Sequence, residues 1–262
     1  MPSSITLMLQ AWGLTAALML VFWLVAVKTR NAGWVDVGWT LGLLACVWYY
    51  ALWTNGSALR HWLLAGAVSL WAVRLVNHML VRFVAEGHED KRYQKIREDW
   101  KTNLNLKFFF FFQFQAFLDV VLSTCWLPSM KNPTPVLSIL EIFGVSIWII
   151  GFFGESIADG QLKAFKADPA NKGKTCQAGL WNYSRHPNYF FEWSMWLGYA
   201  VFAFASPWGW ISLLAVALMY HFLMNVSGVP LAEAQSLKSR GEEYRRYQQT
   251  TSMFVPLPKR KI

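Results

Sequence analysis

The chain has 262 residues, of which 55% are hydrophobic, 17% aromatic and only 15% charged, and its formal net charge is +9. Soluble domains carry roughly 25% charged residues, so this composition argues against a soluble protein and favours a membrane protein. The three cysteines, Cys46, Cys125 and Cys176, have no spacing that would build a disulfide framework or a zinc site.

Seven apolar runs are long enough to cross a bilayer, which takes about 20 residues. In chain order they lie near residues 5–27, 34–54, 61–84, 107–129, 135–158, 188–206 and 208–227. Two long polar connections, 85–106 and 159–187, and a polar tail after residue 228 complete the chain. We therefore expect an all-α integral membrane protein with seven transmembrane helices, forming a single transmembrane domain over residues 1–262.

Lysine and arginine predict the orientation, because cytoplasmic loops are enriched in these residues. All 24 of them except Arg60, Arg74 and Lys131 fall on the side shared by the two long connections and the tail. This bias predicts a cytosolic C-terminus and an N-terminus outside. Topology and attraction to anionic membrane lipids then explain the positive charge without nucleic acid. No obligatory protein partner is indicated.

Several familiar motifs are absent from the sequence. "GKT" at 173–175 resembles the end of a phosphate loop, but Asp168 stands where that loop requires glycine. No G-x-G-x-x-G or G-x-S-x-G motif occurs, and the five histidines lack metal-ligand spacing. We therefore expect neither a soluble-type nucleotide domain nor a metal site.

Polar residues at membrane depth are the positive signal, since such groups are costly in hydrocarbon and are candidates for function. At the end of the fifth run, helical spacing predicts one shared face for Glu155, Asp159, Lys163 and Lys166. The alternative is a pair of structural contacts on a helix that leaves the bilayer.

The stretch "SRHPNYFFEW" at 184–193 predicts a helix start, because Pro187 suits a first turn. Arg185 and His186 precede it, where orphan backbone N–H groups attract anions. One face of the helix then carries Asn188, Glu192 and Trp196. This arrangement suits a ligand with phosphates and hydroxyls. The alternative makes Arg185 and His186 interfacial anchors, with Glu192 paired to a lysine.

The tail, residues 227–258, reads as an amphipathic segment that carries Glu233 and the tyrosines Tyr244 and Tyr247. Its lysines and arginines are also what a solvated face touching lipid headgroups would carry.

The pattern "GLWNYSRHPNYFFE" from Gly179, followed by "WLGY" from Trp196, resembles the C-terminal region of the steroid 5-alpha-reductase family. The resemblance extends through "ESIAD" and "GEEYRRYQQTTSMFVP" and covers roughly residues 140–258. The N-terminal "GWVDVGW" and "GHEDKRY" are similar to the bacterial branch of that family. The resemblance implies seven transmembrane helices around a cytosol-facing cavity. NADPH in that cavity would give hydride to the C4–C5 double bond of a 3-oxo-Δ4-steroid.

Carried over by position, the resemblance implies a cofactor region over 135–258 and a substrate side over 1–130. The implied cofactor contacts are Asp159, Asn188, Glu192, Trp196 and Tyr244, with Lys163 and Lys166 toward the adenosine 2′-phosphate. The candidate cofactor set also includes Tyr183, Arg185, His186 and Glu233.

On the substrate side, conjugate reduction of an enone calls for hydrogen-bond donors at the carbonyl oxygen. The resemblance implies that Asp36 is the acid, and we expect it to be neutral and to donate. The family's tyrosine has no counterpart in the third run, which offers Arg74, Asn77 and His78 instead. The alternative for Asp36 and Arg74 is a purely structural ion pair.

Two other functions fit part of the pattern. Membrane isoprenylcysteine and phospholipid methyltransferases, which bind S-adenosylmethionine, share "RHPNY" and a "GEEYRRY"-like tail. A sterol- or lipid-binding protein without catalysis is the third possibility. Cations at Lys163, Lys166 and Arg185 favour NADPH, so we expect a reductase acting on a steroid or sterol-like lipid in a bacterial inner membrane rather than endoplasmic reticulum.

Overall fold

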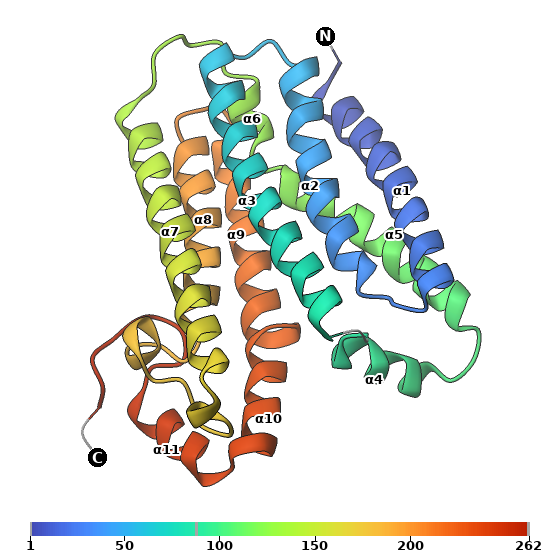
Figure 1. Ribbon diagram of the computed structural model, residues 1–262. Coiled ribbons are helices and arrows are strands. Elements are labelled where there is room, and N and C mark those ends of the chain that lie inside the picture. Colours follow the sequence, from blue (N-terminus) through green and yellow to red (C-terminus); the bar gives the residue numbers. More distant parts are fainter. Residues whose placement is uncertain (1, 87–88, 261–262) are drawn as a thin grey trace. The chain divides into compact units, whose positions relative to one another are not determined.

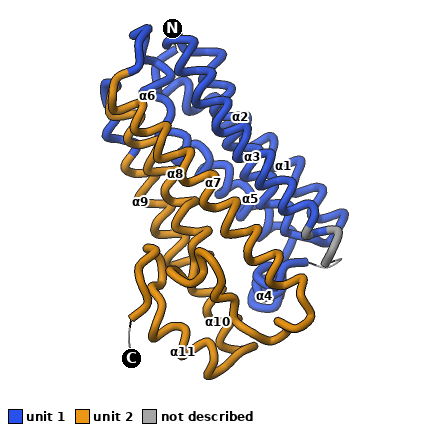
Figure 2. The backbone as a smooth tube through the Cα atoms, turned by 60° about the vertical axis from the view of Figure 1, so that its left-hand side comes forward, with its two compact units in different colours: residues 1–137, 206–212 blue, residues 138–205, 213–262 orange. Residues whose placement is uncertain are grey.

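The computed structural model describes residues 2–86 and 89–260, which form α-helices joined by loops and turns (Figure 1). Within these ranges no β-strand occurs, and β-type pairing is limited to an isolated bridge between Ser184 and Ser252. The chain divides into two compact units, residues 1–137 with 206–212 and residues 138–205 with 213–262 (Figure 2). The prediction of an all-α protein is confirmed.

The described residues of the first unit form six helices, and capping residues define both ends of the first one. They are α1 Ser4–Thr29, α2 Trp34–Trp53, α3 Ala58–Glu86, α4 Lys91–Trp100, α5 Leu104–Ser123 and α6 Leu127–Met130. The Ser3 hydroxyl caps α1 by accepting a hydrogen bond from the Thr6 backbone at 3.1 Å. Arg30 ends α1 in a left-handed conformation with φ 53°. Within the unit, α2 packs against α1, α3 and α5.

The second unit contains two long helices and a C-terminal group of shorter ones. They are α7 Ile139–Ala167, α8 Pro187–Ala203, α9 Ser212–His221, α10 Val229–Arg240 and α11 Glu242–Thr250. A π-helical segment, Phe222–Val226, follows α9, and short 3₁₀ turns lie at Pro169–Asn171 and Gly179–Asn182. A capping box starts α7, because Ser138 and Glu141 each bond the other's backbone N–H.

Glycines let α7 and α8 approach closely. A methyl group on Gly144 would lie 2.6 Å from the Phe202 backbone nitrogen, and one on Gly198 would lie 2.8 Å from the Gly144 oxygen. A methyl group on Gly151 would lie 2.8 Å from the Phe191 oxygen. Small residues at such interfaces are typical of helices that associate within membranes.

Six helical segments are long and apolar enough to cross a membrane, which indicates an integral membrane protein. They are Ser4–Thr29, Trp34–Trp53, Ala58–Val81, Leu104–Ser123, Ile139–Ala167 and Gly209–Arg240. The helix at the sixth predicted run, α8, has 17 residues. Large apolar side chains on these helices are exposed, for example Phe110 at 63% and Ile150 at 62%, as hydrocarbon-facing residues would be.

The structure corrects several predicted boundaries. The fourth run does not continue to 129: α5 ends at Ser123, and α6 restarts with Pro128 in its first turn, where proline is tolerated. The connection 85–106 contains α4, whose N-cap Asp90 accepts a hydrogen bond from the Arg92 backbone at 2.8 Å. The other connection is shorter than predicted, because α7 continues to Ala167.

Candidate functional site

The start of α8 is built as its sequence predicts. Pro187 occupies the first turn, after the N-cap residue His186. The imidazole ring of His186 stacks on Tyr189 with ring centroids 5.4 Å apart and an interplanar angle of 5°. Pro187 therefore fixes where the polar face of α8 begins.

That face meets α7 through an amide–carboxylate contact. The Asn188 side-chain nitrogen donates to Asp159 Oδ1 at 3.3 Å. The Asn188 Oδ1 atom is buried and has no hydrogen-bond partner among the described residues. An orphan acceptor of this kind costs free energy unless a ligand donor satisfies it. One turn further on, Trp196 Nε1 donates to Glu192 Oε1 at 2.9 Å, so α7 and α8 bring together four of the predicted cofactor residues.

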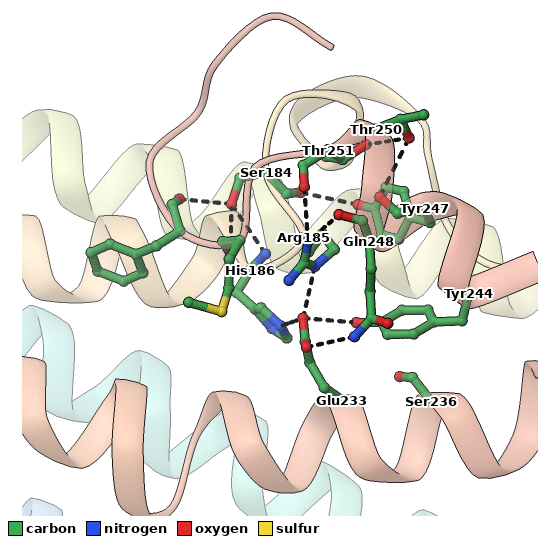
Figure 3. A network of polar contacts seen from close by, with 12 residues as sticks. Ser184, Arg185, His186, Glu233, Ser236, Tyr244, Tyr247, Gln248, Thr250 and Thr251 are labelled. Atoms are coloured by element: carbon green, nitrogen blue, oxygen red, sulfur yellow. Dashed lines mark hydrogen bonds and ion pairs between the residues drawn. The ribbon is translucent and has the colours of Figure 1, made fainter. Parts of the chain in front are cut away.

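Glu233 of α10 is the centre of a second polar group, shown in Figure 3. Its Oε1 atom accepts from Arg185 Nε at 2.7 Å and lies 3.3 Å from His186 Nε2. The Tyr244 hydroxyl reaches the same oxygen at 3.5 Å, and Gln248 Nε2 donates to Oε2 at 2.7 Å. The structure thus unites Arg185, His186, Glu233 and Tyr244, all four of them predicted site residues.

Arg185 also ties the tail to the start of α8. Its Nη1 atom donates to the backbone oxygens of Gln248 at 2.8 Å and Thr251 at 2.9 Å, and its backbone N–H donates to Ser252 at 2.8 Å. Only 8% of Arg185 is exposed, and these donor groups bind acceptors of the protein itself (Figure 3). Its expected contact with the cofactor stays a prediction.

The tail tyrosines are buried within this network. Burial, reinforced by the negative charge of Glu233, raises the pKa of Tyr244 to about 12. Burial likewise raises the pKa of Tyr247, whose hydroxyl donates to the backbone oxygens of Trp181 and Ser184. Tyr247 was not among the predicted site residues. Its two hydrogen bonds hold the segment before α8 against α11.

The remaining predicted cofactor residues are exposed. Lys163 and Lys166 project from the last turns of α7, and 46% of Tyr183 is exposed. Lys166 lines a cavity of about 290 Å³ together with Lys172, Lys174 and Arg240. This end of the unit therefore offers several cations to an anionic group.

In the first unit, Asp36 lies in the first turn of α2 and is bound from α4. The Tyr93 hydroxyl donates to Asp36 Oδ1 at 2.6 Å, and Arg92 Nη2 donates to Oδ2 at 3.0 Å. Burial and the negative charge of Asp36 raise the pKa of Tyr93 well above its usual value, which Arg92 only partly offsets. Both carboxyl oxygens of Asp36 thus accept a hydrogen bond in this arrangement, and its expected role as a neutral donor stays a prediction.

Tyr93 is the residue that sequence reasoning missed. The second donor was sought in the third apolar run, where Asn77 and His78 have exposed side chains and Arg74 is partly buried. Tyr93 instead reaches Asp36 from the connection 85–106. The sequence feature that could have identified Tyr93 is the motif "GHEDKRY", which ends with it. Gly87 and His88 of this motif lie outside the described residues.

An apolar cluster surrounds Tyr93, which is 5% exposed. It includes Met19, Val35, Phe108 and Phe112, with Trp34 and Trp39 partly buried against it. A polar pair beside such a cluster can orient one polar end of a large apolar ligand.

A comparison with protein families matches residues 22–251 to the family described as "Protein of unknown function (DUF1295)". The chain belongs to this family. The DUF1295 family is related to steroid 5-alpha-reductase-like proteins. The chain is also similar to an uncharacterized protein of Schizosaccharomyces pombe, with 26% identity over 230 residues that cover 75% of this chain and 67% of the relative. No solved structure matches the chain.

Proposed function

We propose that this protein reduces the C4–C5 double bond of a 3-oxo-Δ4-steroid, or of a similar enone lipid, with NADPH as the hydride donor. The observation that carries the proposal is the Tyr93 hydroxyl, which is hydrogen-bonded to Asp36 beside an apolar, aromatic cluster. Conjugate reduction places negative charge on the carbonyl oxygen, and a positioned donor at that oxygen stabilises it.

Each polar residue of this pair has a distinct role in the proposal. Tyr93 donates toward the carbonyl oxygen once the enone takes the place of Asp36 as acceptor. Its raised pKa keeps the hydroxyl protonated at neutral pH. Before the enone binds, Asp36 holds the hydroxyl in position, and Arg92 is bound to both Asp36 and Asp90. A methyl transfer from S-adenosylmethionine has no need of such a pair.

The second unit fits the cofactor. The buried, unsatisfied Asn188 Oδ1 suits the N–H donors of a carboxamide or the hydroxyl of a ribose. Asp159 on α7 and Glu192 on α8 add acceptors, and in the proposal the exposed Lys163 and Lys166 of α7 supply cations to the phosphate. When bound, NADPH supplies the hydride; these residues bind and orient it. The proposed cofactor-binding set also contains Trp196 and Tyr244. Its further predicted members are Tyr183, Arg185, His186 and Glu233.

The proposal includes seven transmembrane helices, with the N-terminus outside and the C-terminus in the cytosol of a bacterium. Helices occur at all seven predicted runs, and α8, at 17 residues, is at the lower limit of about 17–25 residues for a span. The distribution of Lys and Arg supports the orientation.

Anaerobic incubation of the purified protein with NADPH and testosterone or progesterone tests the activity. We expect steroid-dependent loss of the nicotinamide absorbance and a product heavier by two hydrogens. The control replaces the steroid with its 4,5-saturated analogue, which has no bond to reduce. No oxidation, together with a thermal shift on S-adenosylmethionine but not on NADPH, would contradict the proposal and indicate a methyltransferase.

A further inference from the structure

A cavity of about 500 Å³ lies in the first unit, where α1 ends and α5 begins. Its apolar wall is formed by Trp23, Val27, Leu104 and Phe108. Trp23 Nε1 donates to the Asn105 backbone oxygen at 2.9 Å, which joins the two helices at this wall. The volume is in the usual range for small-molecule sites, roughly 300–1,000 Å³, and the Asp36–Tyr93 pair does not line it.

The polar side of this cavity holds a fixed guanidinium. Arg97 binds Glu89 through two atoms, with Nε to Oε2 at 2.8 Å and Nη2 to Oε1 at 3.1 Å. The guanidinium carbon also lies 4.8 Å from the centre of the Phe108 ring. Glu89, whose side chain is 9% exposed, accepts a further bond from the Ala32 backbone at 2.6 Å. Arg97 is therefore held in place, and its Nη1 atom makes no hydrogen bond within the described residues.

A second guanidinium makes the cavity positive. Arg30, at the left-handed end of α1, lines the same cavity. Among the side chains that the structure describes, no carboxylate lies within ion-pair distance of its guanidinium. Since Glu89 neutralises Arg97, the described lining residues carry one net positive charge, and Arg30 supplies it.

Exposed apolar side chains continue outward from the wall. Leu24 is 53% exposed, Val27 37% and Leu106 55%. These residues lie on α1 and α5, two helices apolar enough to cross a membrane. The position combines cations, a pocket and a hydrocarbon-facing surface at the ends of two membrane helices.

We propose that this cavity binds an anionic phospholipid, with the headgroup phosphate between Arg30 and Arg97 and the chains along Trp23, Val27 and Leu106. The positive charge complements the lipid phosphate, and guanidinium groups suit phosphate oxygens. The apolar wall favours a lipid over a soluble phosphate, because a soluble phosphate has no hydrocarbon chain to pack against it. The proposal does not depend on the reductase activity.

Native mass spectrometry of the full chain, with phosphatidylglycerol or phosphatidylcholine of identical chains, tests it. We expect preferential retention of phosphatidylglycerol. Arg30→Gln should weaken that retention about fivefold, the effect of one cation near a membrane surface. Lys28→Gln is the matched control, since Lys28 is an exposed cation two residues away that does not line the cavity. Arg97→Lys keeps the charge beside Glu89 while removing the two-atom contact, and should also weaken retention.

Equal retention of the two lipids would overturn the proposal, as would equal effects of Arg30→Gln and Lys28→Gln. Inorganic phosphate provides the last arm. If phosphate stabilises the protein in an Arg30-dependent way while phosphatidylglycerol binding is unchanged in Arg30→Gln, the cavity binds a soluble anion and the lipid proposal is wrong.

Discussion

Tyr93 is the residue on which the proposed chemistry depends most directly. Replacing it by phenylalanine removes the hydroxyl that donates to Asp36 and leaves the ring in its apolar cluster. We expect Tyr93→Phe to lower kcat by about 10²–10³-fold, the usual effect of removing one donor at a developing oxyanion. Steady-state turnover measures the loss of kcat, and unchanged turnover would contradict the role of Tyr93 as a donor. NADPH titration is the control, because the affinity for NADPH should stay as in the parent protein.

Tyr244 makes stability depend on pH in the alkaline range. Its pKa is raised from 10.0 to about 12, so the folded protein keeps a proton that the unfolded chain loses. Its contribution to stability is therefore complete below pH 10 and is lost as the pH rises toward 12. We expect thermal unfolding to show a smaller alkaline loss in Tyr244→Phe than in the parent. Tyr183→Phe, at an exposed ring, is the control and should behave like the parent.

The ion pair between Arg185 and Glu233 is buried, with side chains 9% and 15% exposed. Arg185→Gln leaves Glu233 without its main charged partner, and we expect a loss of about 3–5 kcal/mol in the free energy of unfolding. The double variant with Glu233→Gln should lose less than the sum of the single variants. Arg245→Gln breaks an exposed pair with Glu242 and should change stability by less than about 1 kcal/mol. Similar losses at Arg185 and Arg245 would contradict a structural role for the buried pair.

At the scale of helices, the contact between α7 and α8 depends on glycine. We expect Gly198→Ala to destabilise the protein by about 1–3 kcal/mol, because the added methyl group meets the backbone of α7 rather than a mobile side chain. Gly160→Ala, on α7 with nothing within 4 Å, is the matched control and should stabilise by up to about 1 kcal/mol. Unfolding in a denaturant series measures both, and equal effects would show that close packing is not what the glycines provide.

The apolar runs and the polar loops between them predicted most of the helices. Pro187 begins α8 as expected, and Glu155, Asp159 and Lys163 share α7. Local spacing was sufficient for these features because each depends on neighbours within a few residues. The helix α4 was missed, since its short polar sequence has no apolar face long enough to distinguish it from a loop.

The candidate site was predictable only in part, for a related reason. Asp36 and Tyr93 are distant in sequence, and the resemblance pointed to the third apolar run for the second donor. In the same way, the contacts of the Arg185 guanidinium with Glu233 and the tail were not predicted, while its predicted contact with the cofactor stays a prediction. Spacing along one helix identifies which residues share a face; it does not identify which distant segment folds back onto them.

For the whole molecule, the proposed orientation can be tested with cysteine labelling. The natural cysteines Cys46, Cys125 and Cys176 are all buried, which keeps background labelling low. We expect Asn55→Cys to react with an impermeant maleimide on intact cells. Gln249→Cys should react only after permeabilisation, because the tail is proposed to be cytosolic. The reverse pattern would overturn the orientation.

The bridge between Ser184 and Ser252 makes the start of α8 depend on residues that the ribosome adds much later. Every helix of the second unit is synthesised before Thr251 and Ser252, whose backbone oxygens bind Arg185. A nascent chain arrested before Thr251 would contain the helices while lacking the contacts that fix the segment before Pro187. The segment before Pro187 therefore gains these contacts only after all the helices of the second unit have been translated.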